Sequence, residues 1–193
     1  MNEDFVIKSE TALNKLAIGN DIYVHSCHNP AYISQKRRTE TTQNGQNPYA
    51  VILTCSDSRV SPEHIFSAGI GDLFVVRTAG NVVGKFELGS IEYAVQQLNA
   101  PIIVVMGHTH CGAVSAALEG YANGYINDII HEIQLGLNGA KTEDEAICNN
   151  ILHSQQQVLQ SKTVNCLVEA GQLMVVSAEY NIETGHVYFF NDC

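Results

Sequence analysis

The chain has 193 residues, 45% hydrophobic and 16% charged, values typical of one globular domain with a sizeable core. Its formal net charge is −10 with only 10 Lys or Arg residues, which argues against the basic face that nucleic-acid binding requires. Residues 1–4 lack the basic start of a signal peptide, and no apolar run reaches the roughly 18 residues needed to cross a membrane. We therefore expect a cytoplasmic protein with neither a nucleic-acid nor a membrane partner.

The N-terminal part of the chain, residues 1–48, is expected to form a helical arm followed by a wrapping segment. Apolar residues recur with helical spacing over residues 9–18, and Gly19 is expected to end this helix. Residues 25–48 are polar and contain two prolines and an Asn-Gly pair, which predicts an irregular segment.

Strands and helices then alternate over residues 49–193, which are expected to be the core of a single domain. Strands are predicted at residues 50–54, 73–76, 102–106, 173–178 and 187–190. Helices are predicted after Ser61-Pro62 and at residues 87–98, 111–118, 126–136 and 143–170. This alternation predicts an α/β fold with a mainly parallel central sheet of about five strands, flanked by helices. The last two strands are too close in sequence for a crossover helix, so that edge pair should be antiparallel.

Six cysteines occur in the chain. Without an export signal, they argue against a disulfide framework. Four of them show no regular spacing and are expected to be reduced: Cys27, Cys148, Cys166 and Cys193.

Two polar clusters, which contain the other two cysteines, follow the first and third predicted strands. They are Cys55-Ser56-Asp57-Ser58-Arg59 and His108-Thr109-His110-Cys111. Open α/β sheets place their chemistry beyond the carboxyl ends of the strands. Both clusters are therefore expected to contribute to one shared site.

The residue types in these clusters favour a zinc ion. Two thiolates and one imidazole, from Cys55, Cys111 and His108, suit tetrahedral zinc and leave one coordination position over. The sequence has no Cys-x-x-Cys pair to close the site, so a catalytic zinc is favoured over a structural one. Zinc acidifies bound water and so provides hydroxide near neutral pH, although two anionic thiolates weaken this effect.

Asp57 and Arg59 are two residues apart and could both project from the loop after the first strand. If they pair, Arg59 holds Asp57 ionised as an acceptor that orients the zinc-bound water. Asp57 is also close enough in sequence to Cys55 to serve as a fourth zinc ligand, which would close the site. The sequence leaves both arrangements open.

At these residues the chain resembles the β-class carbonic anhydrases. The likeness rests on residues 46–60, 74–81, 90–94 and 107–112, and it extends over about residues 10–190. It implies reversible hydration of carbon dioxide to bicarbonate, with one zinc ion per subunit on Cys55, His108 and Cys111. It also implies that Asp57 and Arg59 form a catalytic dyad.

The resemblance further implies how the small-molecule substrate, carbon dioxide or bicarbonate, is bound. Gln46 corresponds to a side-chain amide that hydrogen-bonds the substrate, and Gly112 to a backbone amide that does the same. Phe74 and Tyr93 correspond to aromatic walls of the pocket, in which Ala79 also lies. The resemblance implies a homodimer or a dimer-based tetramer, with Tyr93 near the partner subunit and the N-terminal arm packed on the neighbour.

Two other functions remain open on this sequence. Relatives that hydrolyse carbonyl sulfide or carbon disulfide share the same zinc ligands, and a fold does not decide the substrate. The second alternative is a non-catalytic zinc protein in which Asp57 permanently closes the metal site.

Overall fold

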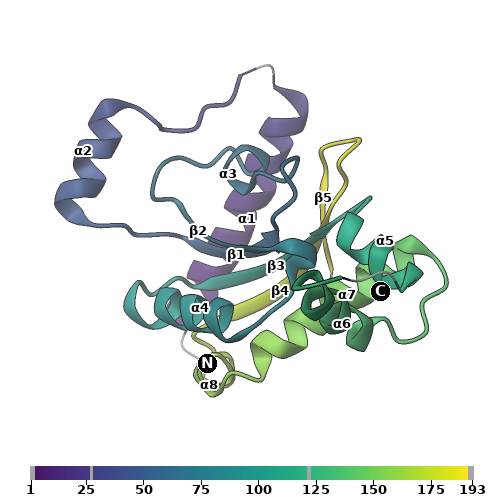
Figure 1. Cartoon of the computed structure of the whole chain (residues 1–193). Helices are drawn as coiled ribbons and strands as arrows, with labels where there is room; N and C mark the ends of the chain where they lie inside the picture. The colour runs from purple at the N-terminus through teal and green to yellow at the C-terminus, as the bar shows by residue number, and fades with distance from the viewer. Residues whose placement is uncertain (1–2, 27, 121–122, 191–193) are drawn as a thin grey trace.

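A five-stranded sheet forms the centre of the computed structural model, which describes residues 3–26, 28–120 and 123–190 (Figure 1). The strands are β1 (Ala50–Cys55), β2 (Leu73–Thr78), β3 (Ile102–His108), β4 (Met174–Tyr180) and β5 (Val187–Phe190). Their order is β2-β1-β3-β4-β5; β1 to β4 pair in parallel, and β5 runs antiparallel to β4. The predicted fold class is confirmed, including the antiparallel edge pair.

Helices cover both faces of this sheet (Figure 1). Ala50 and Ile52 of β1 pack in the apolar cluster that includes residues of α1 (Glu3–His25) and α3 (Pro62–Ile65). The alternate residues Val51 and Leu53 pack in a second cluster, with residues of five other helices. These are α4 (Lys85–Gln97), α5 (Gly112–Glu119), α6 (Ile126–Gly136), α7 (Glu143–Leu159) and α8 (Lys162–Glu169). Both faces of β1 are therefore buried, as its continuous apolar run predicts. No helix within the described ranges combines the length and apolar character needed to cross a membrane.

Helix α1 extends beyond the predicted residues at both ends, and Gly19 does not end it. A Cβ atom at Gly19 would lie 2.0 Å from the backbone oxygen of Phe66, so the missing side chain permits a close approach to the segment after α3. The next residue, Asn20, is buried and donates from Nδ2 to the carbonyls of Ile65 and Gly185 at 3.2 and 2.8 Å. Gly19 and Asn20 therefore hold α1 against Ile65, Phe66 and Gly185, and the helix continues past them.

The segment predicted to be irregular contains a helix, α2 (Gln35–Asn44). The side chain of Ser34 caps it by accepting a hydrogen bond from the backbone N–H of Arg37. None of its residues is buried, and the helix lies apart from the sheet in Figure 1. A helix with no buried face leaves no apolar period in the sequence, which is why it was not predicted.

The predicted helix over residues 143–170 is two helices, α7 and α8. The side chain of Ser161 accepts a hydrogen bond from the backbone N–H of Val164 and so begins α8. Helix α6 has the predicted bounds.

The expectation for the cysteines holds only in part. Cys148 is disulfide-bonded, so the expectation that it is reduced is wrong. Cys166 is free and exposed, and Cys27 and Cys193 lie outside the described residues. Pairing depends on how closely two Cβ atoms approach in space, which irregular sequence spacing does not reveal.

Candidate metal centre

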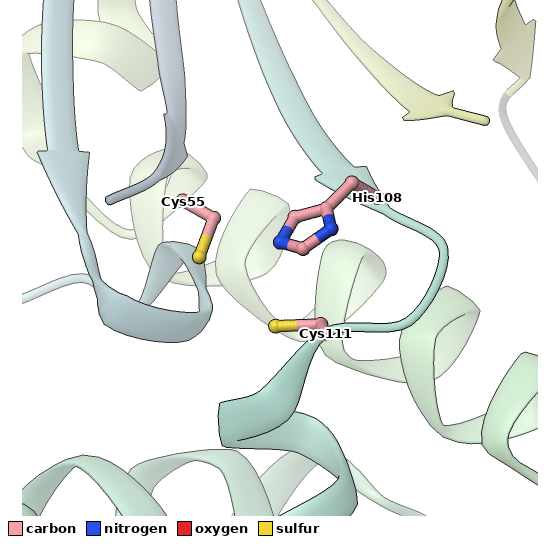
Figure 2. A group of neighbouring side chains, drawn as sticks. All are labelled: Cys55, His108 and Cys111. Atoms are coloured by element: carbon pink, nitrogen blue, oxygen red, sulfur yellow. The ribbon is translucent and has the colours of Figure 1, made fainter. Parts of the chain in front are cut away.

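The three predicted metal ligands meet beyond the carboxyl ends of two neighbouring strands (Figure 2). Cys55 ends β1, His108 ends β3, and Cys111 is the N-cap of α5. Their two sulfur atoms and one imidazole nitrogen all lie within 4.8 Å of one another. Each of the three residues is at most 4% exposed. The parallel pairing of β1 with β3 therefore places the two sequence clusters in one site, as expected.

The imidazole of His108 presents one nitrogen to this cluster. Its Nδ1 lies 2.9 Å from the backbone oxygen of Thr109. Because a carbonyl only accepts, Nδ1 carries the proton, and in the neutral imidazole Nε2 then carries the lone pair. Nε2 is buried and has no hydrogen-bond partner among the described residues. A buried acceptor without a partner is unfavourable, and a metal ion would satisfy it.

The two sulfur atoms complete a donor set that fits zinc. The close approach of the two sulfur atoms lowers the pKa of Cys55 and raises the pKa of Cys111, so Cys55 ionises first and Cys111 keeps its proton. A divalent cation would take the place of that proton. Zn–S bonds of about 2.3 Å and Zn–N bonds of about 2.0 Å place tetrahedral ligand atoms about 3.5 to 3.8 Å apart, in keeping with this cluster.

Asp57 is held by Arg59 beside the metal ligands. The carboxylate accepts from the backbone N–H of Arg59 at 2.9 Å, from Nε at 3.0 Å and from Nη2 at 2.8 Å. These bonds lower the pKa of Asp57 to about 2. Arg59 Nη2 also donates to the backbone oxygen of His110 at 3.1 Å. Asp57 Oδ2 lies 4.0 Å from Nε2 of His108, so the pair with Arg59 keeps an ionised acceptor at the site.

Arg77 in β2 and Gly80 just after it hydrogen-bond to this loop. The sequence alone did not predict these contacts. Arg77 of β2 donates to the backbone oxygens of Cys55 and Asp57, at 2.9 and 2.7 Å. The backbone N–H of Gly80 donates to Cys55 Sγ at 3.3 Å, and that of Asp57 does so at 3.4 Å. The signal that could have found Arg77 and Gly80 is the parallel pairing of β2 with β1, in which Thr78 lies opposite Cys55.

Two of the predicted substrate-binding residues, Ala79 and Gly112, are sequence neighbours of Gly80 and Cys111 at the metal centre. Two others, Phe74 and Tyr93, contact each other. Ala79 begins the short helix η1 (Ala79–Asn81), directly before Gly80. Gly112 begins α5, directly after Cys111. Phe74 of β2 and Tyr93 of α4 contact each other, with ring centroids 6.2 Å apart, and Tyr93 is 49% exposed.

Gln46 lines a different part of the described structure from the metal-centre residues. It is exposed, between α2 and β1, and lines a cavity of about 670 Å³ together with residues of α2 and its flanks: Arg37, Glu40, Thr41, Asn44, Gly45 and Asn47. The metal ligands line no part of that cavity. The fold of one chain does not bring Gln46 to the metal centre.

Comparison with known proteins gives a consistent result over the same residues. The family model described as carbonic anhydrase matches residues 50–187, which include both sequence clusters. The chain is 40% identical over 152 residues to carbonic anhydrase 2 of Mycobacterium tuberculosis, covering 73% of each protein. It is 40% identical over 171 residues to a carbonic anhydrase of Mycolicibacterium smegmatis, covering 82% of each. The solved structure of the beta-carbonic anhydrase CcaA is similar, with a TM-score of 0.73 and 27% identity, covering 93% of this chain and 95% of that one.

Proposed function

The chain belongs to the β-class carbonic anhydrases, lyases that hydrate carbon dioxide reversibly, and we propose that it acts through one zinc ion held by Cys55, His108 and Cys111. One observation carries the proposed metal site. Within the described part of the chain, Nε2 of His108 is buried without a hydrogen-bond partner, and a ring nitrogen of His108 lies within 4.8 Å of two cysteine sulfurs. A zinc ion bound there supplies the acidity that makes a water molecule a nucleophile near neutral pH.

The pH dependence of turnover should reflect the ligand set. In carbonic anhydrases with three histidine ligands, the zinc-bound water has a pKa of about 7. Two thiolates neutralise more of the charge of the ion than two imidazoles do. We therefore expect the midpoint of the rise in turnover to lie above about pH 7.

We propose that Asp57 is the acceptor that orients the reacting water. It is ionised above about pH 2, and the hydrogen bonds from Arg59 fix its direction. Closing the site with Asp57 would require breaking three bonds to Arg59, which is itself anchored on the backbone of His110. These bonds support an open site as the resting arrangement.

The substrate side of the site is proposed to form between two chains. Phe74, Phe86 and Tyr93 make up what we term the aromatic face. Phe86 and Tyr93 are seven residues apart on α4 and are 75% and 49% exposed, while Phe74 packs on Tyr93. Exposed aromatic side chains on one helix face are typical of an interface. A homodimer formed through this face would cover it.

The remaining substrate contacts follow from the same proposal. Gln46 is exposed and separate from the metal centre of its own chain, so its amide is proposed to act after assembly. Ala79 is proposed to line the pocket. The backbone N–H of Gly112 lies in the first turn of α5, where donors and the helix dipole favour a negatively charged oxygen.

The direct test of substrate is to measure turnover of carbon dioxide and carbonyl sulfide on one zinc-loaded preparation. We expect carbon dioxide hydration to dominate. Preferential turnover of carbonyl sulfide would identify a hydrolase instead. Absence of both activities up to about pH 9, with zinc fully bound, would favour a non-catalytic zinc protein with a closed site.

A further inference from the structure

We propose that Asn150 of α7 is a positioning residue for the metal centre, because through Gly80 it directs a backbone N–H at the sulfur of Cys55. The side chain of Asn150 is 1% exposed, and its Nδ2 donates to the backbone oxygen of Gly80 at 2.8 Å. The N–H of the same glycine donates to Cys55 Sγ at 3.3 Å. Holding the carbonyl of Gly80 restricts the rotation of that residue and so the direction of its N–H. The inference rests on the proposed zinc site.

A second side chain of α7 holds the next residue of the same turn. Ser154 lies four residues after Asn150, on the same face of the helix. Its Oγ donates to the backbone oxygen of Asn81 at 3.0 Å and accepts from Asn81 Nδ2 at 3.2 Å. Asn81 and Ser154 are each 1% exposed. Two buried polar residues of one helix thus hold two consecutive residues of η1.

The turn has an unusual backbone, with two consecutive residues in the left-handed region. Gly80 has φ 65° and ψ 21°, and Asn81 has φ 48°, which is uncommon for a residue other than glycine. A Cβ atom at Gly80 would lie 2.6 Å from Cδ1 of Ile133, so α6 presses on the turn from another side. The position of the Gly80 N–H is therefore set by its neighbours.

Asn150 makes a side-chain hydrogen bond to the backbone oxygen of Gly80. Its Oδ1 is buried and, in the described ranges, has no hydrogen-bond partner. A buried amide that is only half satisfied carries a desolvation cost, which the bond to Gly80 offsets. The group that gains from the amide is Gly80, and through it the metal ligand.

An N–H donated to a cysteine sulfur has two consequences for a bound metal. It fixes the direction of the sulfur lone pairs, and it withdraws electron density from the thiolate. Groups that orient a metal ligand in this way typically contribute about 10- to 100-fold in metal affinity or activity.

The test compares Asn150→Leu with Asn149→Leu. Asn149 is the neighbouring residue of the same helix, and its Nδ2 also donates to a backbone oxygen at 2.8 Å, but that oxygen belongs to Leu137. Zinc affinity is measured by chelator competition, and the cobalt-loaded proteins are compared by their sulfur-to-metal charge-transfer band. We expect Asn150→Leu to weaken zinc binding about 10-fold and to move the band to longer wavelength. Asn149→Leu should leave both unchanged.

Ser154→Ala provides a second test that does not depend on the folding of Asn150→Leu. It removes both bonds to Asn81 and should shift zinc affinity and the band in the same direction, by a smaller amount. If Asn150→Leu and Ser154→Ala, whichever of them fold, match the wild type in zinc affinity and band position, the inference is overturned. The proposed zinc site would then still stand. A wild-type chain that bound neither zinc nor cobalt would overturn the proposed function as well.

Discussion

The metal centre and the aromatic face differ in how far one chain completes them. Cys55, His108 and Cys111 are buried, and neighbouring strands and helices hold the loops that carry them. Phe86 and Tyr93 are exposed, and Gln46 lines a cavity that none of the metal-centre residues lines. A single chain can therefore group the three proposed metal ligands, whereas the substrate contacts are proposed to depend on a second copy.

The largest effect should come from removing a metal ligand. Cys111→Ala leaves one sulfur and one imidazole, too few to retain zinc, so zinc content and carbon dioxide hydration should both fall to background. Zinc is measured by elemental analysis and hydration by stopped flow. Cys166→Ala, which changes a free and exposed cysteine, should retain both. A Cys111→Ala protein that kept zinc and activity would show that the metal centre is assigned wrongly.

The next largest effect should separate zinc binding from turnover. Asp57→Asn removes the charged acceptor but no proposed ligand, so zinc content should stay at one per chain while turnover falls about 100-fold. Asp72→Asn is the matched control, since Asp72 also pairs with an arginine, Arg37, at 3.0 Å. Unchanged turnover in Asp57→Asn would refute the orienting role, and loss of zinc would make Asp57 a ligand.

Breaking the aromatic face tests the other half of the comparison. Tyr93→Glu places a charge on the proposed interface and should weaken the dimer about 30-fold, as the loss of an aromatic anchor commonly does. Sedimentation velocity over a range of concentrations measures this, and turnover should fall in parallel with dissociation. Tyr125→Glu, at a tyrosine that is 92% exposed, should change neither. A monomeric Tyr93→Glu protein with full turnover would mean that one chain holds the complete active site.

The smallest effect concerns how the free energy of unfolding of the protein depends on pH. Asp57 has a pKa of about 2, below its usual 3.8, because Arg59 hydrogen-bonds its ionised form. A lowered pKa stabilises the folded protein above about pH 4, and this contribution is lost as pH falls towards 2. The difference in unfolding free energy between wild type and Arg59→Gln should therefore narrow from pH 5 to pH 2. Urea unfolding measures it.

Arg38→Gln is the control for this pH series, because Arg38 donates to a backbone oxygen, that of Ile33. Its difference from wild type should stay constant over the same range. A constant difference for Arg59→Gln would contradict the shifted pKa of Asp57.

The sequence allowed the grouping of Cys55, His108 and Cys111 to be predicted, because the two sequence clusters follow strands that are short, apolar and parallel. Cys55 and His108 are 53 residues apart, yet the carboxyl ends of neighbouring parallel strands must meet at one sheet edge. Helix α2 leaves no apolar period in the sequence because it buries no residue, and Gly19 resembles a helix end although the structure uses it for a close approach to Phe66.

The contact of Asn150 with Gly80, behind the proposed ligand Cys55, could not be predicted in the same way. Asn150 and Gly80 are 70 residues apart, and neither belongs to a pattern with a local period. Their contact depends on how α7 packs on the turn after β2, which is a matter of tertiary packing. The substrate contacts are harder still, because the proposed neighbours of Gln46 and Tyr93 belong to a second chain.

The most direct test of the central claim is to return zinc stepwise to metal-depleted protein and follow carbon dioxide hydration by stopped flow. We expect turnover to rise in proportion to bound zinc and to stop rising at one zinc per chain. Turnover that did not depend on zinc, or full zinc loading without turnover up to about pH 9, would contradict a catalytic zinc on Cys55, His108 and Cys111.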